Sequence, residues 1–321
     1  MSACERYQPT QDQFALATVM GDALEALLPI QRLHDQPHET EDAWGELATL
    51  GVFGISRSEE DGGSGLGPAE EALVALELGR RLASPAVFAT LGVDAACAPG
   101  TVDRVAAAWT EGDGVVMAEE PNASNVLIRD ADGVRLVSTM AAERCVDEVH
   151  WSARLMTLDA PPGVGDRLDE KAGLRLQLFN AAALAGLSGA ALAMAVQYAG
   201  FREQFGRPIG AFQAVKHHCA DMALAAGGAT DLVTFAAVAL AEEREDAPEL
   251  VDSALAVAGL AAVRNAALNV QIHGGVGFSD EADPHLLVKR ARLYLAAAGG
   301  VDAALERLAA HSPSPDRDGR A

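Results

Sequence analysis

The sequence has few aromatic residues for its length. Phe, Trp and Tyr make up only 5% of its 321 residues, so large rings cannot dominate the core. Half of the residues are nevertheless apolar, which is enough to bury a substantial core. Alanine, the residue that loses the least side-chain entropy in a helix, is abundant, and this favours closely packed helices.

Cationic residues are outnumbered by acidic ones. The 24 Lys and Arg residues stand against 46 Asp and Glu residues, which gives a formal net charge of −22. A surface that binds nucleic acid needs dense Lys and Arg to neutralise phosphates, so we exclude a nucleic-acid partner. An anionic ligand would have to be held by a few local cations, because the overall field repels it.

Cysteine is also scarce. The four cysteines, Cys4, Cys97, Cys145 and Cys219, are widely separated and form no CxxC pair. Such spacing is typical of free thiols in a reducing compartment, so we expect a cytoplasmic protein. The first six residues are polar and lack the apolar core of a signal peptide.

Apolar runs in the sequence are short. The longest extends from Ala181 to Val196, is rich in Ala and Gly, and is interrupted by Ser188. A membrane-spanning helix needs about 20 predominantly apolar residues. We therefore expect a soluble protein without a membrane-spanning segment.

The spacing of apolar residues changes along the chain. In residues 1–112, Val19, Leu24 and Leu27 recur near helical spacing, which predicts an N-terminal helical domain. Residues 113–172 instead hold short β-like runs separated by turn residues, which predicts a small β domain.

Long helical segments are expected again in residues 173–311. Phe212, Val215 and Cys219 belong to an amphipathic stripe, and four such segments predict a C-terminal four-helix bundle. The tail, residues 312–321, alternates Ser and Pro and is expected to be disordered. The predicted fold class is therefore mainly α with a small β insert.

Three segments carry a more specific pattern. They are Leu50–Arg80 with the run Glu-Glu-Asp-Gly-Gly, Arg202–His217 with Arg-Glu-Gln-Phe-Gly-Arg-Pro-Ile-Gly, and Gln271–Phe278 with Gln-Ile-His-Gly-Gly-Val-Gly-Phe. Together, and in this order, they resemble the acyl-CoA dehydrogenase family. The resemblance implies that family's N-terminal helices, a middle β domain that is reduced here, and a C-terminal bundle. It also implies FAD-dependent α,β-desaturation of an acyl-CoA thioester.

The same resemblance implies a set of cofactor contacts. In the family these segments reach across a dimer interface to the adenosine and pyrophosphate of the neighbouring subunit's FAD. The residues concerned here are Arg202, Phe205, Gln213, Gln271, Gly274 and Gly275. A guanidinium such as that of Arg202 can give pyrophosphate two charge-assisted hydrogen bonds. Gly274 and Gly275 lack a Cβ, so their backbone N–H groups can face a ligand.

These residues also have purely structural interpretations. Phe205 suits a hydrophobic core, and Arg202 suits a surface ion pair. Gly274-Gly275 suits a helix C-cap. His217-His218 suggests a metal, but no Cys, Asp or Glu stands at ligand spacing, so we expect none.

The expected catalytic base is absent. A dehydrogenase of this type needs a carboxylate within hydrogen-bond reach of the proton on the substrate α-carbon. In most of the family a glutamate occupies the place that is Ala298 here, and in a minority branch it lies near Leu176. Neither place carries a carboxylate, so no catalytic residue is assigned to this chain.

The β domain departs from the family as well. Its flavin-facing elements survive only as Ala118–Asn125, and Trp151-Ser152 is a poor match to the later strand. Some family members that degrade bulky acyl-CoA thioesters combine a base-bearing subunit with a short one. This chain resembles the short, non-basic partner of such an α2β2 enzyme, which implies a longer partner subunit that carries the catalytic Glu.

Two other interpretations stay open. A homomeric dehydrogenase would need an atypical base, and Glu281 and Asp283 are the nearest carboxylates in sequence to the expected region. Alternatively, the chain is an inactive scaffold that binds acyl-CoA or a partner.

Overall fold

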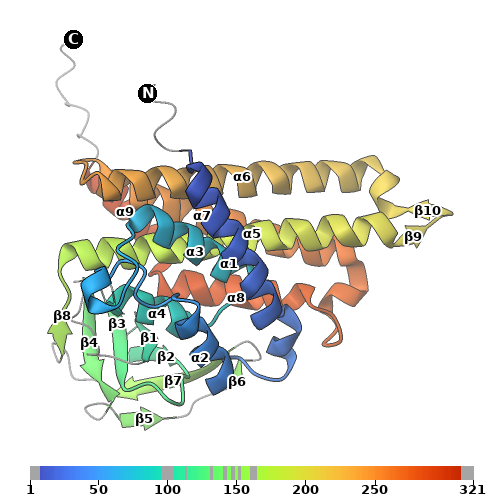
Figure 1. Ribbon diagram of the computed structural model, residues 1–321. Helices are drawn as coiled ribbons and strands as arrows, with labels where there is room; N and C mark the ends of the chain where they lie inside the picture. The colour runs from blue at the N-terminus through green and yellow to red at the C-terminus, as the bar shows by residue number, and fades with distance from the viewer. Residues whose placement is uncertain are drawn as a thin grey trace, which may run out of the picture.

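The computed structural model describes residues 8–94, 104–112, 114–130, 133–139, 143–145, 149–150, 153–159 and 165–311. Long helices form an extended layer, and a sheet lies beneath one end of it (Figure 1). The chain passes from the N-terminal helices into the sheet and then into the C-terminal bundle. The tail predicted to be disordered, residues 312–321, lies outside the described residues.

The described residues 8–94 form four α-helices and two 3-10 turns. These are α1 Gln11–Leu27, η2 Ile30–His34, α2 Glu41–Thr49, η3 Glu59–Asp61, α3 Pro68–Arg80 and α4 Pro85–Asp94. Helix α1 begins where it does because Thr10 and Gln13 cap each other's backbone N–H groups. Pro68 stands at the first position of α3, where a missing N–H costs nothing.

An eight-stranded sheet follows. Its strands are β1 Val105–Glu111, β2 Gly114–Ala118, β3 Asn125–Asp130, β4 Gly133–Ser138, β5 Glu143–Cys145, β6 Val149–His150, β7 Ala153–Asp159 and β8 Asp166–Arg167. The strand order is β5-β7-β2-β1-β3-β4-β8, with β6 paired to β7. Strands β1 and β3 run parallel, and the other described pairs are antiparallel.

Strand β1 corrects the sequence-based boundary. The helical prediction covered this segment, because its run of alanines has a high helix propensity. In the structure, residues 105–109 are buried, with β2 on one edge of the strand, β3 on the other, and α4 packed against it. Tertiary packing overrides local propensity here, and the sheet begins at Val105 rather than at residue 113.

The C-terminal part is a helical bundle with a hairpin at one end. Its elements are α5 Glu170–Phe201, β9 Glu203–Gln204, β10 Arg207–Pro208, η5 Ile209–Ala211, α6 Gln213–Ala241, α7 Ala247–His273, η6 Gly274–Phe278, α8 Pro284–Ala297 and α9 Gly300–His311. Helices α5 to α8 are the four predicted from the sequence, and α9 packs on α7 in addition.

Three bundle helices are long and apolar enough to cross a membrane by length and composition alone, namely those of residues 170–201, 213–241 and 247–278. The expectation that no segment is long and apolar enough to span a membrane is therefore wrong as far as length and composition go. Scattered small polar residues shorten an apolar run but hardly lower the mean hydropathy of a helix. In the bundle, 67% and 61% of the apolar stretches of α5 and α7 are buried, but only 39% of that of α6. Helix α6 thus leaves an apolar face uncovered within the described chain.

Helices α3 and α5 cross unusually closely. A Cβ added to Gly186 would lie 2.0 Å from the carbonyl oxygen of Leu76, and one added to Gly79 would lie 2.3 Å from that of Ala183. Real Cβ atoms do not approach backbone this closely. The two glycines therefore allow the N-terminal helices to pack directly on the bundle.

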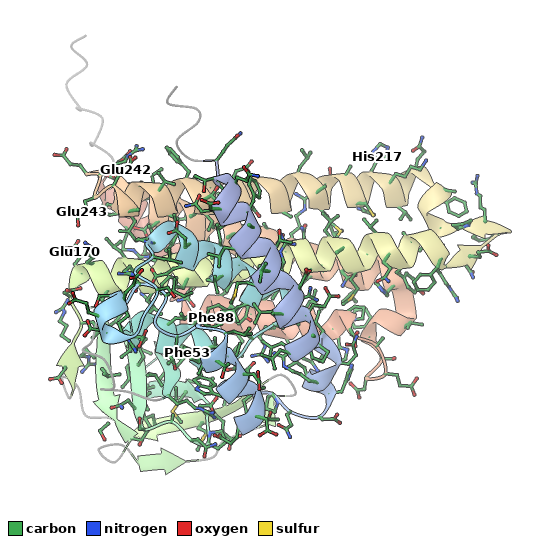
Figure 2. All side chains as sticks on the ribbon, in the orientation of Figure 1. Phe53, Phe88, Glu170, His217, Glu242 and Glu243 are labelled. Atoms are coloured by element: carbon green, nitrogen blue, oxygen red, sulfur yellow. The ribbon has the colours of Figure 1, made fainter. Side chains whose placement is uncertain are left out.

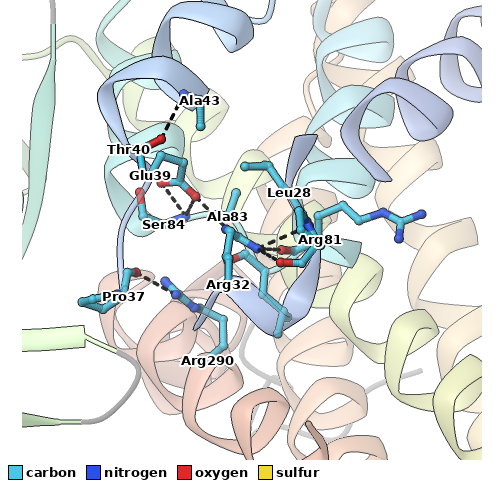
Figure 3. Close-up of polar contacts among 12 residues, drawn as sticks. Leu28, Arg32, Pro37, Glu39, Thr40, Ala43, Arg81, Ala83, Ser84 and Arg290 are labelled. Atoms are coloured by element: carbon cyan, nitrogen blue, oxygen red, sulfur yellow. Dashed lines mark hydrogen bonds and ion pairs between the residues drawn. The ribbon is translucent and has the colours of Figure 1, made fainter. Parts of the chain in front are cut away.

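A buried polar network fixes α8 to the N-terminal helices (Figure 3). Glu39 accepts hydrogen bonds from Arg32 and from the Ser84 backbone N–H, at 3.1 and 3.0 Å. Burial would raise the pKa of Glu39, but Arg32 and Ser84 hold it below its ordinary value. From α8, Arg290 donates to the Pro37 carbonyl. The network positions the helix whose end leads into Ala298.

Candidate functional site

The six residues expected to contact a cofactor lie at one end of the bundle. Helix α5 ends there, the β9–β10 hairpin projects beyond it, and α6 begins there (Figure 1). Helix α7 also ends there, since the rings of Tyr198 on α5 and His273 on α7 stack with centroids 3.9 Å apart. All six side chains or backbone positions are exposed. We call this region, residues 201–217 and 271–278, the hairpin end.

Phe205 stands at the tip of the hairpin in a strained conformation. The turn between Gln204 and Arg207 has two residues, Phe205 and Gly206, with φ of +54° and +75°. A bulky residue rarely adopts a positive φ, and such strain gathers at functional sites. The ring is 92% exposed, which rules out the core interpretation of Phe205. It meets Phe212 edge to face, with centroids 6.1 Å apart.

The hairpin end offers donors for an anion. Arg202 is the exposed C-cap of α5, and its guanidinium makes no ion pair with any described residue. Arg207 lies over the Phe212 ring at 4.2 Å from the centroid. Helix α6 begins at Gln213 without a side-chain cap, so its first N–H groups and its positive dipole end face solvent.

The backbones of Gly274 and Gly275 differ in what they leave open to a ligand. Gly274 has φ +64° and ψ −143°, a conformation that excludes residues with a Cβ. Its N–H is already bonded to the Gln271 and Val270 carbonyls, so the idea that it faces a ligand is wrong. A Cβ added to Gly275 would have nothing within 4 Å, which leaves its backbone open to an approaching ligand.

Charge is distributed unevenly along the bundle. Figure 2 shows Glu170, Glu242 and Glu243 together at the end away from the hairpin, and His217 on α6 near the hairpin. The hairpin end itself carries Arg202, Arg207 and Lys216, with Glu203 as its acidic exception. Local cations thus gather at this end in spite of the strongly negative net charge.

The two places expected for the base are both buried. Leu176 on α5 is 5% exposed, and Ala298, just after α8, is 1% exposed. Leu176 and Ala297 line the same cavity of about 20 Å³, which is room for little more than one water molecule. Ala89 and Ala107 line it from α4 and β1. Among the described residues around this cavity there is no carboxylate.

Arg129 is the charged side chain of that cavity. It extends from β3, and its Nε and Nη2 atoms are buried without a hydrogen-bond partner in the described part of the chain. Burial and, to a smaller extent, the nearby Arg307 lower the pKa of Arg129 to about 10, while Asp252 opposes the shift. Sequence reasoning missed Arg129. The residues around it in the sequence do not show that its guanidinium is buried without a hydrogen-bond partner among the described residues.

The alternative carboxylates lie elsewhere. Asp283 precedes α8 and binds Gln31 and His34 at 2.6 and 2.9 Å, while Glu281 is exposed. Helix α8 has 14 residues and so separates Asp283 from Ala298 by about 20 Å. Neither carboxylate reaches the cavity.

The remnant of the flavin-facing signature serves the core. Glu120 is 1% exposed and accepts a hydrogen bond from Arg104 Nη1 at 2.9 Å. Arg104 also lies over the Trp44 ring, 4.0 Å from its centroid. Burial raises the pKa of Glu120 to about 7, although Arg104 opposes the shift. Trp151 and Ser152, the poor candidates for the later strand, lie outside the described residues.

Comparison with known proteins decides the family. The family model for the acyl-CoA dehydrogenase N-terminal domain matches residues 10–105, and that for the C-terminal domain matches residues 175–312. A relative named acyl-CoA dehydrogenase IpdE2, from Mycolicibacterium smegmatis, is 31% identical over 259 residues, covering 75% of this chain and 78% of the relative. The chain belongs to the acyl-CoA dehydrogenase family.

Relatives differ in how much of their length the chain covers. Acyl-CoA dehydrogenase FadE34 from Mycobacterium tuberculosis is 33% identical over 319 residues, which cover 84% of this chain but only 42% of FadE34. The chain therefore spans less than half of that acyl-CoA dehydrogenase and about three quarters of IpdE2.

Solved acyl-CoA dehydrogenase structures share the fold. A chain of the ChsE4-ChsE5 complex from Mycobacterium tuberculosis matches with a TM-score of 0.74 and 22% identity, covering 96% of this chain and 100% of that one. A chain of the Tcur3481-Tcur3483 steroid acyl-CoA dehydrogenase matches with a TM-score of 0.75 and 22% identity, covering 94% and 97%. Both of these are complexes of two different chains.

The hairpin end fits the anionic part of the family's cofactor, FAD. An unpaired guanidinium at Arg202 and an uncapped helix start at Gln213 are groups that bind pyrophosphate. No cluster of three or more His, Cys, Asp and Glu residues that suits a metal occurs among the described residues.

Proposed function

We propose that this chain is the non-basic subunit of a heteromeric, FAD-dependent acyl-CoA dehydrogenase. In this proposal the hairpin end contacts a flavin that is bound mainly by a partner subunit. The partner also supplies the base that removes the substrate α-proton. The observation that carries this proposal is the cavity between Leu176 and Ala297. Leu176 lines this cavity together with Ala297, the residue before Ala298. Both expected places for the base are apolar and buried, and the charged residue of the cavity is Arg129.

The exposed hairpin end supports a shared cofactor site. Phe205 is held outward at the cost of backbone strain, and Arg202 has no partner among the described residues. A flavin touched only by these groups would be covered on one side, so the remaining contacts come from another chain. When bound, FAD supplies hydride acceptance, while the groups of this chain bind and orient its pyrophosphate and adenosine.

The proposed partner is a longer subunit that carries the catalytic glutamate. Uncovered apolar side chains support a large interface, since Leu224 on α6 and Leu260 on α7 are 77% and 61% exposed. The structural likeness to chains of two-component complexes is consistent with this assembly. We propose an α2β2 arrangement in the cytoplasm.

The proposed reaction is α,β-desaturation of an acyl-CoA thioester, with a bulky or polycyclic acyl group as the favoured substrate class. The substrate preference rests on likeness to heteromeric relatives, of which one is named a steroid enzyme. The homomeric alternative would need a base, but Asp283 lies about 20 Å from the cavity.

Flavin stoichiometry tests the proposal. The chain would be produced alone and together with a longer family member that carries the glutamate, sought among the neighbouring genes, and flavin absorbance would be compared with polypeptide concentration. We expect the chain alone to be colourless or poorly soluble, and the complex to hold about one flavin per pair of unlike chains. A yellow, active homomer with one flavin per chain contradicts the proposal, and a stable complex that holds flavin only in the proportion bound by the partner alone, with unchanged activity, favours the scaffold interpretation.

A further inference from the structure

A wide groove opens next to the small cavity. It has a volume of about 710 Å³ and lies between strands β3 and β4, the start of α5, the start of α7, and α9. Its walls include Gly173, Leu174 and Gln177 of α5. Such a volume is large enough to take a small organic ligand.

Among the residues that the structure describes, Arg129 alone lines both the groove and the cavity. Its stem runs beside the loop between α8 and α9, because a Cβ added to Gly299 would lie 3.2 Å from the Arg129 Cδ atom. Gly299 has φ +86°, so the loop itself is shaped by a glycine-only conformation. Arg129 therefore lies between the outer groove and the small cavity at Leu176 and lines both.

The nearest acid does not neutralise Arg129. Asp252 is 3% exposed and accepts bonds from Arg307 Nη2 and Nε at 2.6 and 2.9 Å, and it also binds Gln177. Asp130, the neighbour in sequence, pairs with Arg135 at 2.5 Å. Arg129 is thus a charged group at the wall of a cavity that is otherwise lined by Pro, Ala, Leu and Asn.

We propose that Arg129 closes this chain's own acyl pocket. An acyl chain coming from the groove toward Leu176 and Ala298 would have to displace the guanidinium and lie against it. An alkyl group cannot replace the polar contacts that a buried cation needs, so entry is opposed sterically and electrostatically. The inference rests on the proposed function, which identifies Leu176 and Ala298 as the places of the missing base.

The consequence for the assembled enzyme is one acyl site for each pair of unlike chains. Loss of the base alone would leave an unproductive pocket that still competes for substrate. Closure by Arg129 removes that pocket, so acyl-CoA is directed to the subunit that can turn it over.

Counting acyl sites in the purified complex tests this closure. The probe is the octyl thioether of coenzyme A, which has no carbonyl and cannot react, and titration calorimetry gives its stoichiometry. The wild-type complex should bind about one thioether per pair of unlike chains, and Arg129→Ala should bind about two, the second more weakly. Arg129→Ser provides a second opening variant, and a crystal structure of either shows whether groove and cavity have joined.

Two matched variants serve as controls. Arg129→Lys keeps a cation on a long stem, and Arg167→Ala removes a different arginine from the groove wall. Both should stay at the wild-type stoichiometry, and flavin content should be unchanged in all variants.

Several outcomes overturn the closure. A wild-type complex that already binds two thioethers, one of which Arg129→Ala abolishes, makes Arg129 a ligand anchor. An opened variant that gains no site, or a variant structure in which groove and cavity remain separate, shows that Arg129 is not the closing group. If the wild-type complex holds one flavin but binds two thioethers per pair of unlike chains, the closure by Arg129 is wrong while the proposed function stands. One flavin per chain in a homomer defeats the proposed function itself.

Discussion

At the scale of single residues, the proposed binding of FAD pyrophosphate by the hairpin end depends most on Arg202. Its guanidinium is exposed, makes no ion pair with any described residue, and stands at the junction of α5 and the hairpin. A guanidinium can bond two phosphate oxygens at once, which an ammonium cannot do in the same geometry.

Arg202→Met should weaken FAD retention roughly ten- to a hundredfold, because a charge-assisted hydrogen bond contributes on the order of 1.5–3 kcal/mol. Methionine keeps much of the stem packing, so helical content and assembly should survive. Flavin release during dilution and gel filtration of the complex measures the effect. Arg264→Met, on an exposed arginine of α7, is the control. If the Arg202→Met complex kept its full flavin content, Arg202 would be an ordinary surface residue without a role in FAD binding.

Glu120 gives the chain a pH-dependent stability. Its pKa in the folded state is raised to about 7 from the ordinary 4.5, so the folded state binds this proton more tightly than the unfolded state. Its stabilising contribution is complete below about pH 4.5 and is lost as the pH rises through about 7.

The wild-type melting temperature should therefore fall from pH 5 to pH 8 by a few degrees more than that of Glu120→Gln, which cannot titrate. Glu111→Gln, on an exposed carboxyl at the end of β1, should keep the wild-type profile. Thermal unfolding followed by circular dichroism across this range gives both curves. Parallel profiles for wild type and Glu120→Gln would mean that Glu120 is already ionised throughout.

At the scale of elements, the crossing of α3 and α5 holds the N-terminal helices on the bundle. The space at Gly186 is occupied by the Leu76 carbonyl, whereas a Cβ added to Gly173 on the same helix would have nothing within 4 Å. The two glycines therefore form a matched pair for one substitution.

Gly186→Ala should destabilise the chain by about 1–3 kcal/mol, since overpacking forces the helices apart. Gly173→Ala should instead stabilise it by about 0.5–1 kcal/mol, because alanine replaces a flexible residue in a helix interior. Denaturant unfolding of the two variants beside the wild type measures both signs. Equal effects at the two positions would show that the helix crossing is looser than the structure indicates.

Element types could be predicted wherever local pattern and tertiary packing agree. The bundle helices follow from the spacing of their apolar residues and from the Gly and Pro residues at which they end. That α5 and α7 end side by side is seen only in the structure, where Tyr198 stacks on His273. Strand β1 could not be predicted, since its alanines favour a helix until β2 and β3 pair with it. The bonded N–H of Gly274 and the unpaired guanidinium of Arg129 were also beyond reach, because both depend on which groups lie nearby after folding.

At the scale of the whole molecule, turnover is expected to depend on a residue that this chain lacks. The cavity at Leu176 and Ala297 has no carboxylate among its described residues, and Asp283 is hydrogen-bonded to Gln31 and His34. General-base catalysis in the proposed enzyme must then come from the partner.

Replacing the partner's glutamate by glutamine should slow turnover by roughly two to four orders of magnitude, the usual scale for a general base. Asp283→Asn and Glu281→Gln in this chain should leave kcat nearly unchanged. Steady-state desaturation by the purified complex, with an artificial electron acceptor, compares the three variants. A comparable loss from Asp283→Asn or Glu281→Gln would place the base in this chain.

The placement of the tryptophans determines how this protein can be observed spectroscopically. Trp44 lies beneath Arg104 in the N-terminal helices, and Trp109 packs on β1 against Leu293 of α8, while residues 165–311 contain no tryptophan. Tryptophan fluorescence therefore reports on the sheet and its surroundings, whereas the bundle is followed by its far-ultraviolet dichroism. Following both signals in one unfolding experiment shows whether the two parts melt together. Events at the hairpin end need the emission of the flavin itself or a tryptophan introduced beside it.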